Sequence, residues 1–324
     1  MNKEARIYIA GHRGLVGSAI HRKLISLGYQ NLILRPSKEC DLRDQAQVRE
    51  LFEQEKPEYV FLAAAKVGGI LANNQYPVEF LEENLLIQLN VIRQAYQSDV
   101  ERLLFLGSSC IYPKDCPQPI KEEYLLTGPL ELTNRAYALA KIAGIEQCWA
   151  YNREYGTKYL AAMPTNLYGP NDNYDLNTSH VLPALIRKIH EAKNLHQKNM
   201  TAWGSGKPRR EFLFSDDLAD ACVFLLNLSD QDYLPLVRSQ EGQAPLINVG
   251  FGSDVSIEEL IETIKQVIGF EGETLWDKSK PDGTMKKLMD SSRIKNLGWS
   301  PKVSLKEGIG LAYQDYLRRY VQKN

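Results

Sequence analysis

The chain has 324 residues and a formal net charge of -1, which gives no electrostatic reason to expect binding to nucleic acid or to a membrane surface. Hydrophobic residues make up 44% and charged residues 24%, as in ordinary soluble globular proteins. The five cysteines are odd in number, scattered and without a CxxC pair, which argues against a disulfide framework or a metal site. With no signal peptide and no long apolar run, these features predict a cytoplasmic protein with neither a nucleic-acid nor a membrane partner.

The first half of the chain alternates short β-branched runs with stretches whose apolar residues recur at helical spacing. Strands that alternate with helices predict right-handed βαβ units and a parallel sheet covered on both faces. The expected strands are 6–11, 31–35, 58–64, 102–107 and 158–166, and the expected helices are 16–27, 46–54, 80–96 and 136–155.

The second half is less regular and begins with a long loop, 168–180, rich in Asn, Asp, Gly and Pro. We expect helices at 182–192, 217–228, 256–268 and 304–321, with Ser256 and Glu259 forming a capping box, and strands 212–215 and 246–250 that return to the sheet. The predicted fold class is α/β: a Rossmann-type, doubly wound parallel sheet with a smaller, discontinuous α/β substrate lobe. The predicted domains are 1–166 plus about 212–252 for NADP and about 167–211 plus 253–324 for substrate.

A glycine-rich stretch, GHRGLVG, directly follows the first expected strand and directly precedes the first expected helix. Gly11, Gly14 and Gly17 permit a tight turn and let the backbone approach a pyrophosphate, which the helix N-terminus attracts. A chance glycine-rich turn is the alternative, but strand, turn and helix all agree here. The stretch therefore predicts dinucleotide binding.

Cations follow the second expected strand, where an acidic residue would contact the ribose 2′-hydroxyl of NAD. The chain instead has Arg35 and Lys38 there, and Arg13 in the glycine-rich turn. Each could be an ordinary surface residue, but together they suit a 2′-phosphate through charge-assisted hydrogen bonds. The pattern favours NADP and leaves Asp41 for the adenine side.

The stretch YALAK places Tyr137 and Lys141 four residues apart, on one face of an expected helix. A lysine cation beside a phenol lowers the phenol's pKa, so that Tyr137 can exchange protons near neutral pH. An amphipathic helix with a surface lysine would show the same spacing. Ser108, at the carboxyl end of the fourth expected strand, makes the combination much more specific.

These motifs resemble known ones. GHRGLVG, GSSCIYP, YALAK, MPTNLYGP and GSGKPRREFLFSDDLA are similar to stretches of extended short-chain dehydrogenase/reductases that act on nucleotide sugars. GSSCIYP, NDNYDLNTSHVLPALIRK, WGSGKPRREF and SKPDGT resemble the GDP-L-fucose synthase family, and the similarity covers nearly the whole chain. The resemblance implies an NADPH-dependent 3,5-epimerase and 4-reductase that converts GDP-4-keto-6-deoxy-D-mannose into GDP-L-fucose.

The resemblance also assigns roles to the reducing end of the site. Ser108 would hydrogen-bond the 4-keto oxygen, Tyr137 would protonate that oxygen as hydride arrives, and Lys141 would bind the nicotinamide ribose. The cofactor-binding set it implies is Gly11, His12, Arg13, Gly14, Leu15, Val16, Gly17, Arg35, Asp41, Leu106, Gly107, Ser108, Ser109, Lys141, Pro164, Thr165, Asn166, Leu167 and His180.

Epimerisation needs further proton-transfer groups, because C3 and C5 flank the ketone and lose their protons through an enolate. A thiol and an imidazole both exchange protons near neutral pH. The resemblance gives these roles to Cys110 and His180. A lone cysteine is most often a core residue and a loop histidine a surface residue, so each assignment depends on its neighbours.

The substrate's diphosphate needs cations, and the resemblance suggests Lys188, Trp203, Arg210 and Asp282 as substrate contacts. Many members of the family carry arginine where this chain has Lys188, which keeps the charge but loses the bidentate fork. A solvated basic face would be the other interpretation of Lys188.

Three alternatives are weaker. A 4,6-dehydratase would carry an acidic pair after the catalytic Ser or Thr, where this chain has Ser109, Cys110 and Ile111. A 4-epimerase needs neither thiol nor histidine for carbon deprotonation, and a non-catalytic NADP sensor typically loses Tyr or Lys.

The resemblance implies a homodimer that pairs helix 80–97 with the helix that carries Tyr137.

Overall fold

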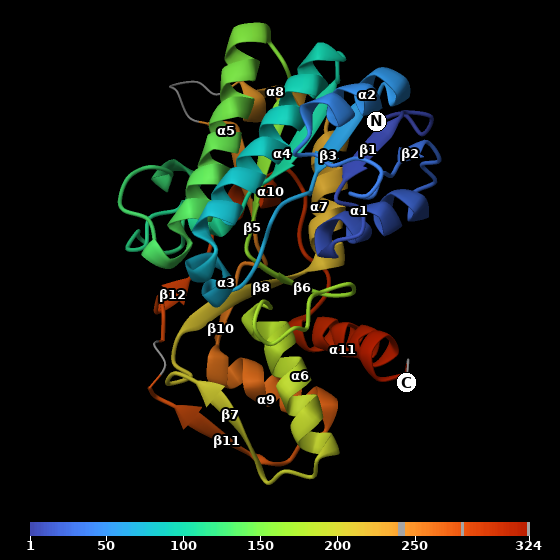
Figure 1. Cartoon of the computed structure of the whole chain (residues 1–324). Coiled ribbons are helices and arrows are strands. Elements are labelled where there is room, and N and C mark those ends of the chain that lie inside the picture. The colour runs from blue at the N-terminus through green and yellow to red at the C-terminus, as the bar shows by residue number, and fades with distance from the viewer. Residues whose placement is uncertain (239–243, 280–281, 323–324) are drawn as a thin grey trace.

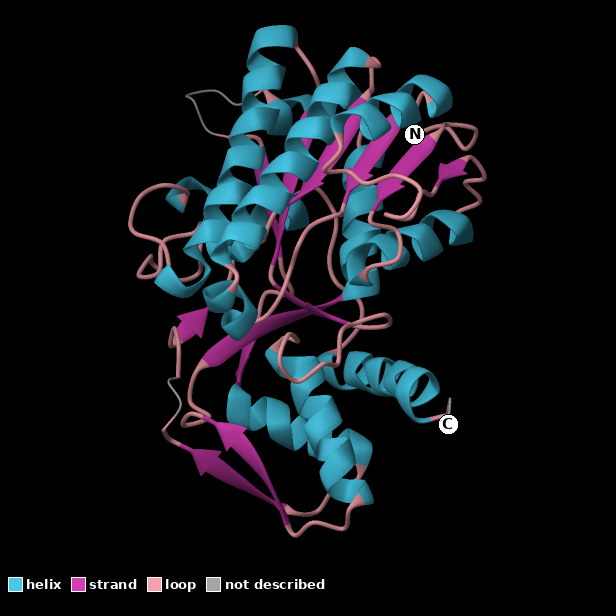
Figure 2. Ribbon diagram, viewed as in Figure 1, coloured by secondary structure: helices cyan, strands magenta, loops and turns pink. Residues whose placement is uncertain are grey.

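A six-stranded parallel sheet forms the centre of the protein (Figures 1 and 2). The structure, a computed structural model, describes residues 1–238, 244–279 and 282–322. The strand order is β2-β1-β3-β4-β5-β9, and almost every strand residue is buried, as expected when helices cover both faces of a parallel sheet. The strands are β1 (Ile7–Ala10), β2 (Leu32–Ile33), β3 (Tyr59–Leu62), β4 (Arg102–Leu106), β5 (Tyr159–Pro164) and β9 (Leu246–Val249).

Alternate strand residues face two separate cores. Ile7 and Ile9 of β1 pack into one core with helices α1 and α7, while Tyr8 and Ala10 pack into the other with α2, α4 and α5. The doubly wound sheet that the sequence predicts is therefore confirmed. The helices are α1 (Leu15–Ser26), α2 (Gln45–Glu55), α4 (Pro77–Gln97), α5 (Arg135–Tyr155), α7 (Ser215–Asn227) and, at the rim, α3 (Ile70–Gln75), α8 (Asp230–Val237) and α10 (Ser292–Asn296).

The order of the strands reverses at β1. The chain leaves β1 to form β2 on one side and then crosses back to form β3 on the other, with Ile7 opposite both Leu32 and Tyr59. Ligands of open parallel sheets bind outside the carboxyl ends of the strands at such a switch point. The topology therefore directs attention to the segments that follow β1, β3 and β4.

A second group of elements lies beyond this edge of the sheet (Figure 1). It contains a four-stranded sheet, a two-stranded sheet and three helices around a third apolar core. Ser256 and Glu259 form the predicted capping box at the start of α9. The elements are β6 (Asn166–Tyr168), β8 (Arg209–Phe214), β10 (Asp254–Ser256) and β12 (Lys286–Lys287); β7 (Asn199–Trp203) with β11 (Glu273–Asp277); and α6 (Val181–Asn194), α9 (Ile257–Ile268) and α11 (Leu305–Tyr316).

The expected return of two strands to the central sheet is half right. Strand β9 does return and lies beside β5, with Ala161 opposite Leu246. The prediction for 212–215 is wrong, because β8 pairs with β6, β10 and β12 in the second sheet. Its apolar run fits a buried strand of either sheet, so composition alone does not decide between them. The domain boundaries remain predictions, and residues 239–243, 280–281 and 323–324 within them lie outside the described residues.

Three further features bear on the sequence predictions. The predicted tail helix 304–321 is α11 followed by a π-helical turn, Leu317–Val321. All five cysteines are free thiols. Over the described residues, every helix is too short or too polar to cross a membrane.

Candidate active site

The turn between β1 and α1 is tightly packed and presents backbone N–H groups at the start of a helix. Gly11 has a φ of 83°, and a Cβ added at Gly17 would lie 2.1 Å from the carbonyl oxygen of Gly11. Gly14 caps α1 without a side-chain hydrogen bond, and the first turn of α1 holds no acidic residue. The Nδ1 atom of His12 is buried and has no hydrogen-bond partner among the described residues. Free backbone donors at the start of α1, a turn too tight for a side chain at Gly17 and an unpartnered nitrogen all fit a bound pyrophosphate.

The other predicted cofactor segments end at the same edge of the sheet. Leu106 ends β4 and is followed by Gly107 to Ser109, while Pro164 ends β5 and Asn166 and Leu167 begin β6. The hydroxyl of Thr165 and the amide of Asn166 donate to the carbonyl oxygen of Glu211, at 3.1 Å and 2.9 Å. The three predicted phosphate- and nicotinamide-binding segments thus lie at the carboxyl ends of β1, β4 and β5.

The predicted cations of the adenosine end have different environments. Arg13 is exposed, whereas Arg35 forms an ion pair with Glu55 and also donates to the carbonyl oxygen of Leu34. A guanidinium that already has a carboxylate partner must share or exchange it to bind a phosphate. Arg13 is therefore the better placed of the two for a 2′-phosphate.

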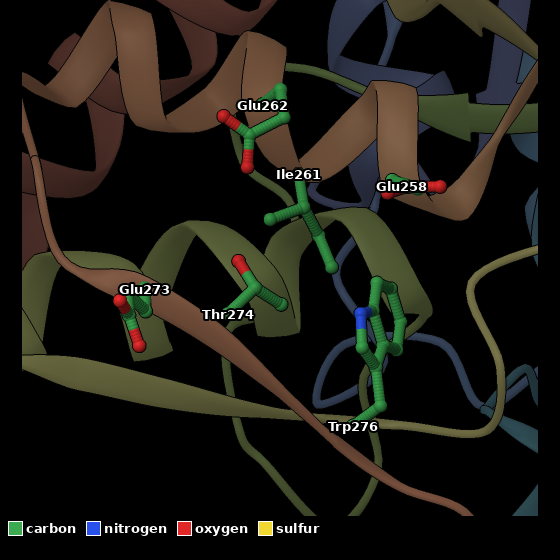
Figure 3. A pocket seen from close by; sticks show the side chains of 6 residues that line it. All are labelled: Glu258, Ile261, Glu262, Glu273, Thr274 and Trp276. Atoms are coloured by element: carbon green, nitrogen blue, oxygen red, sulfur yellow. The ribbon is translucent and has the colours of Figure 1, made fainter.

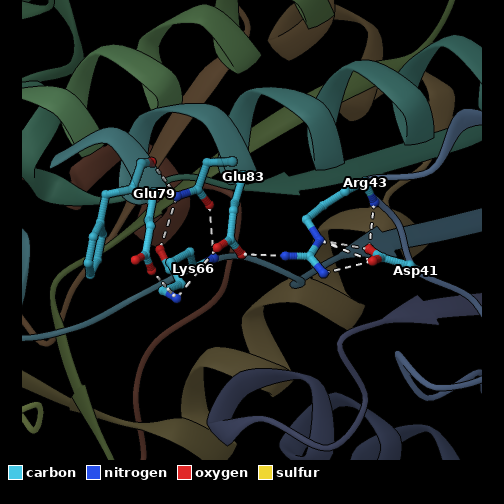
Figure 4. Close-up of polar contacts among 7 residues, drawn as sticks. Asp41, Arg43, Lys66, Glu79 and Glu83 are labelled. Atoms are coloured by element: carbon cyan, nitrogen blue, oxygen red, sulfur yellow. Dashed lines mark hydrogen bonds and ion pairs between the residues drawn. The ribbon is translucent and has the colours of Figure 1, made fainter. Parts of the chain in front are cut away.

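Sequence reasoning missed a chain of ion pairs that begins at Asp41 (Figure 4). Arg43 donates to both carboxylate oxygens of Asp41, at 2.7 to 3.2 Å, and its other guanidinium nitrogen lies 3.3 Å from Glu83. Glu83 also pairs with Lys66, which donates to Glu79 at 2.8 Å. Hydrogen bonds from Arg43 hold the pKa of Asp41 below its usual range. The expected adenine contact of Asp41 would have to act through this fixed carboxylate.

Ser108, Tyr137 and Lys141 meet where β4 ends. The ammonium of Lys141 is only 2% exposed, donates to the carbonyl oxygen of Leu106 at 2.8 Å and lies 5.8 Å from the ring of Tyr137. Helix α5 approaches β4 closely because Gly144 faces Phe105, where an added Cβ would lie 2.5 Å from the ring. The predicted spacing of Tyr137 and Lys141 therefore does bring them to the strand end that carries Ser108.

The protonation of this group differs from the expectation. Burial raises the pKa of Tyr137, the nearby Cys110 raises it further, and hydrogen bonding to Ser108 lowers it. Burial also lowers the pKa of Lys141 to about 8. The expected lowering of the Tyr137 pKa by Lys141 is wrong for this geometry, because the ammonium is directed to Leu106. A phenol with a raised pKa stays protonated at neutral pH, as a proton donor must.

Cys110 lies in the same corner. Strand β4 continues into a 3₁₀ turn, Ser109–Ile111, in which the amide N–H of Cys110 donates to the Ser108 hydroxyl at 3.4 Å. The thiol is buried, and burial raises its pKa; Lys287, Ser108 and Lys141 each act in the opposite direction. Burial is the largest of these effects, so the pKa of the thiol lies above its ordinary value.

His180 begins a helix and is not in the middle of the long loop. It is the N-cap residue of α6; the residue as a whole is exposed, while burial of its imidazole lowers the pKa of that ring. The loop before it is tied at both ends: the Asn171 amide donates to Asp315 at 2.9 Å, and the Gly69 amide donates to the Thr178 carbonyl at 2.9 Å. Among the described residues, His180 makes no side-chain hydrogen bond to Cys110.

The predicted substrate residues fall into pairs. The Lys188 ammonium lies 5.1 Å from the centre of the Trp203 ring. The carboxylate of Asp282 accepts hydrogen bonds from the amide and hydroxyl of Ser205, at 2.6 Å and 2.8 Å, so it closes the turn after Trp203. The two preceding motif residues, 280 and 281, lie outside the described residues.

The two arginines of the KPRR turn differ. Arg209 donates to Asp254 at 2.7 Å and pairs with Glu259, so it holds β8 to β10 and α9. Burial lowers the pKa of Arg210, whose guanidinium donates only to the Arg209 carbonyl oxygen among the described contacts. Arg210 therefore has no ion-pair partner among the described residues, and its role as a substrate contact stays a prediction. Sequence reasoning missed Lys287, which lies beside Arg210 on β12.

A separate pocket of about 330 Å³ lies between α9 and β11 (Figure 3). It belongs to the end of the molecule farthest from the central sheet in Figure 1, so it is not part of the corner that holds Ser108 and Tyr137. Its lining residues are Glu258, Ile261, Glu262, Glu273, Thr274 and Trp276.

The parallel sheet, the glycine-rich turn and the group of Ser108, Tyr137 and Lys141 define a short-chain dehydrogenase/reductase, a class of nicotinamide-dependent oxidoreductases. A sequence model of the NAD dependent epimerase/dehydratase family matches residues 7–234. GDP-L-fucose synthase 1 of Arabidopsis thaliana is 56% identical over 317 residues, which are 98% of this chain and 94% of that protein. The chain therefore belongs to the NAD dependent epimerase/dehydratase family and, within it, to the GDP-L-fucose synthase family.

Solved structures agree with this assignment. A GDP-L-fucose synthetase from Naegleria fowleri bound to NADP superposes with a TM-score of 0.87 at 27% identity, over 99% of this chain and 96% of that one. A GDP-6-OMe-4-keto-L-xylo-heptose reductase from C. jejuni superposes with a TM-score of 0.91 at 39% identity, over 98% and 99% of the two chains. Both neighbours share the whole length of the chain.

Proposed function

We propose that this protein converts GDP-4-keto-6-deoxy-D-mannose into GDP-L-fucose, by epimerisation at C3 and C5 followed by reduction of the C4 ketone. The single observation that carries the proposal is the thiol of Cys110 beside the reducing group of Ser108, Tyr137 and Lys141. A simple ketone reductase needs the second group but not the thiol. The close likeness to curated GDP-L-fucose synthases supports the same reaction.

The reductive half uses groups whose protonation suits it. NADPH, when bound along the glycine-rich turn, supplies the hydride. Ser108 hydrogen-bonds the C4 oxygen, and Tyr137, which is protonated at neutral pH, donates its proton to that oxygen as the hydride arrives and negative charge develops there. Lys141, held by Leu106, orients the nicotinamide ribose. NADP over NAD is supported by Arg13 and by the NADP that the Naegleria fowleri protein binds.

The epimerising half uses a base and an acid beside the sugar ring. Cys110 takes the proton from the carbon next to the ketone, and the electron pair moves into an enolate whose oxygen faces Ser108 and Tyr137. His180, at the start of α6, returns a proton from the other side. Its lowered pKa leaves the imidazole largely neutral at pH 7, so it must gain a proton before it can donate one.

The remaining substrate contacts follow from the second group of elements. Lys188 and Arg210 neutralise the diphosphate, Trp203 covers an apolar face of the ligand, and Asp282 fixes the turn that carries Trp203. The heptose reductase from C. jejuni is named for a different GDP-linked 4-keto sugar, so a 4-keto-heptose is the competing substrate in the test.

We also propose that the protein is a cytoplasmic homodimer with the domains predicted from the sequence. Exposed leucines on α4 and α5 support the pairing of these helices: Leu86 is 46%, Leu89 50% and Leu139 41% exposed. Burying such side chains against a second copy would remove them from water. The molar mass in solution tests this assembly.

The reaction itself is tested with purified protein, NADPH and GDP-4-keto-6-deoxy-D-mannose in deuterated water, followed by absorbance and NMR. We expect NADPH oxidation, deuterium at C3 and C5, and an L-fucose-configured product. Tyr137→Phe should lower reduction by about 10²- to 10⁴-fold yet leave proton exchange, and Cys110→Ser should stop exchange. Reduction without exchange, or a preference for a 4-keto-heptose substrate, would contradict the proposal.

A further inference from the structure

The segment that follows β3 reaches from the central sheet to the loop that carries His180. Gly69 is the N-cap residue of α3, and its amide donates to the Thr178 carbonyl oxygen at 2.9 Å. A Cβ added at Gly69 would lie 2.6 Å from the carbonyl oxygen of Ser179, the residue directly before His180. Two segments that are far apart in the sequence therefore touch backbone to backbone next to the candidate acid.

This contact requires glycine for its small size and not for its backbone conformation. Gly69 has a φ of −66° and a ψ of 178°, an extended conformation that any residue adopts. A side chain here would have to push the Ser179 carbonyl away or break the amide hydrogen bond to Thr178, because two backbone segments leave no space for a Cβ. Gly69→Ala is therefore a test of the contact alone.

Asn73 fixes the glycine side of the contact. Its side chain is buried, and its Nδ2 atom donates to the carbonyl oxygens of Gly68 at 2.7 Å and Gly69 at 3.1 Å. The Gly68 carbonyl and the Gly69 N–H belong to one planar trans peptide and point in opposite directions. The hydrogen bond from Asn73 to this carbonyl therefore also directs the Gly69 N–H toward Thr178.

The loop side of the contact is fixed by a turn of its own. The Asp175 carboxylate accepts hydrogen bonds from the amides of Asn177 and Thr178 and from the Thr178 hydroxyl, each at 3.0 Å. The Ser179 amide donates to the Asp175 carbonyl oxygen at 2.8 Å. This turn sets where the carbonyls of Thr178 and Ser179 face, and α6 begins directly after His180.

The same glycine pair also lies against the reducing group. A Cβ added at Gly68 would lie 3.0 Å from the ring of Phe80. Phe80 is buried, and its ring packs edge-to-face on the ring of Tyr137, with centroids 6.2 Å apart. Segment 68–73 thus contacts Tyr137 through Phe80 and the residues before His180 through Gly69.

We propose that Gly69 is a positioning residue for epimerisation, whose bare backbone fixes the start of α6 and so the place of His180 relative to Tyr137. The assignment rests on the proposed function, in which His180 is the acid. The base takes the proton of the substrate C–H bond, the electron pair moves into the enolate, and the imidazolium N–H of His180 gives a proton back to carbon and becomes neutral. Gly69 takes no part in these transfers and acts only through the position of the imidazole.

The experiment follows Gly69→Ala with GDP-4-keto-6-deoxy-D-mannose and NADPH in deuterated water. NMR measures deuterium exchange at C3 and C5 and the ratio of un-epimerised to L-fucose-configured reduced sugar. We expect exchange to slow about 10- to 100-fold, because proton transfer depends steeply on the placement of the acid. The share of un-epimerised product should rise, since hydride transfer to C4 does not need His180.

The product ratio separates positioning from a merely structural effect, because loss of folded protein lowers both products alike. Gly310→Ala, whose added Cβ would meet open space, is the control and should leave the exchange rate and the ratio unchanged. Unchanged exchange and an unchanged ratio in folded Gly69→Ala would overturn the inference while leaving the proposed reaction intact.

A second pair of variants tests the support of the contact. Asn73→Asp replaces the donating amide with a carboxylate oxygen that faces the carbonyl oxygens of Gly68 and Gly69, so it should shift exchange and product ratio in the same direction as Gly69→Ala. Asn74→Asp changes the exposed neighbour in the same way and should behave as the wild type. Equal behaviour of the two variants would contradict the role of Asn73.

A last readout does not depend on the reaction. Diethyl pyrocarbonate modifies neutral imidazoles, and mass spectrometry separates His180 from the other four of the five histidines. Gly69→Ala should raise the rate of modification at His180 alone, because the displaced loop uncovers the ring. An unchanged rate at His180 would overturn the inference whatever the activity. A raised rate in an enzyme whose wild type exchanges no substrate protons would support the contact and refute the proposed reaction instead.

Discussion

The cofactor side and the substrate side of the proposed site are built in different ways. The cofactor side consists of three short contiguous stretches, 11–17, 106–109 and 164–167, each at the carboxyl end of a strand of one sheet. The substrate side takes single residues from three separate elements: Lys188 from α6, Trp203 from β7 and Arg210 from β8. Local backbone geometry fixes the positions of residues in a contiguous stretch, whereas the positions of scattered residues depend on long-range packing.

The largest loss of stability and ligand affinity should come from a substitution on the cofactor side. Gly17→Ala places a Cβ 2.1 Å from the Gly11 carbonyl, and the backbone at this point cannot move without opening the turn. We expect a loss of about 1–3 kcal/mol in the free energy of unfolding and a large loss of NADPH affinity. Denaturant unfolding and NADPH fluorescence titration measure the two effects.

Gly310→Ala is the matched control, since both glycines lie inside helices but an added Cβ at Gly310 would meet open space. It should be neutral or stabilising by up to about 1 kcal/mol, because alanine is the better helix former. Equal losses of unfolding free energy in both variants would mean that helix propensity, and not the tight turn, causes the loss. The contrast between a locally fixed cofactor side and a scattered substrate side would then be contradicted.

The same contrast explains what the sequence could predict. Gly11 to Gly17 and Ser108 were predictable because a strand, a turn and a helix follow one another, and the central sheet follows from that alternation. Lys287 was not, because β12 has only two residues and pairs with a strand far away in the chain. Arg43 was missed for a related reason: its role depends on Glu83 of α4, and only the folded chain joins them. The placement of β8 failed because its apolar pattern fits either sheet.

A smaller loss, of substrate affinity, should come from a substitution on the substrate side. Lys188→Met removes the ammonium above Trp203 and one charge for the diphosphate, so KM should rise about tenfold with little change in kcat. Lys188→Arg should lower KM, because a guanidinium can bind phosphate in a bidentate manner. Lys306→Met, an exposed lysine on α11, is the control. A fall in kcat at constant KM would place Lys188 in the chemical step and contradict its role in ground-state binding.

The smallest effect concerns the support of the loop that leads to His180. Asp172 is buried, one of its oxygens has no hydrogen-bond partner among the described residues, and its pKa is raised to about 7, chiefly by burial. The folded state holds this proton more tightly than the unfolded state, so its stabilisation is complete below about pH 4 and is lost as pH rises through 7. The slope from one proton is at most about 1.4 kcal/mol per pH unit.

The Asp172→Asn variant cannot ionise at this position and should flatten the dependence of the unfolding free energy on pH between pH 5 and 8. Asp175→Asn is the control and should keep the wild-type slope, because the pKa of the Asp175 carboxyl is lowered and lies below this range. If the wild-type slope persists in Asp172→Asn, the loop is not held by a protonated carboxyl, and the support of the substrate side must be sought in the hydrogen bond from Asn171 to Asp315.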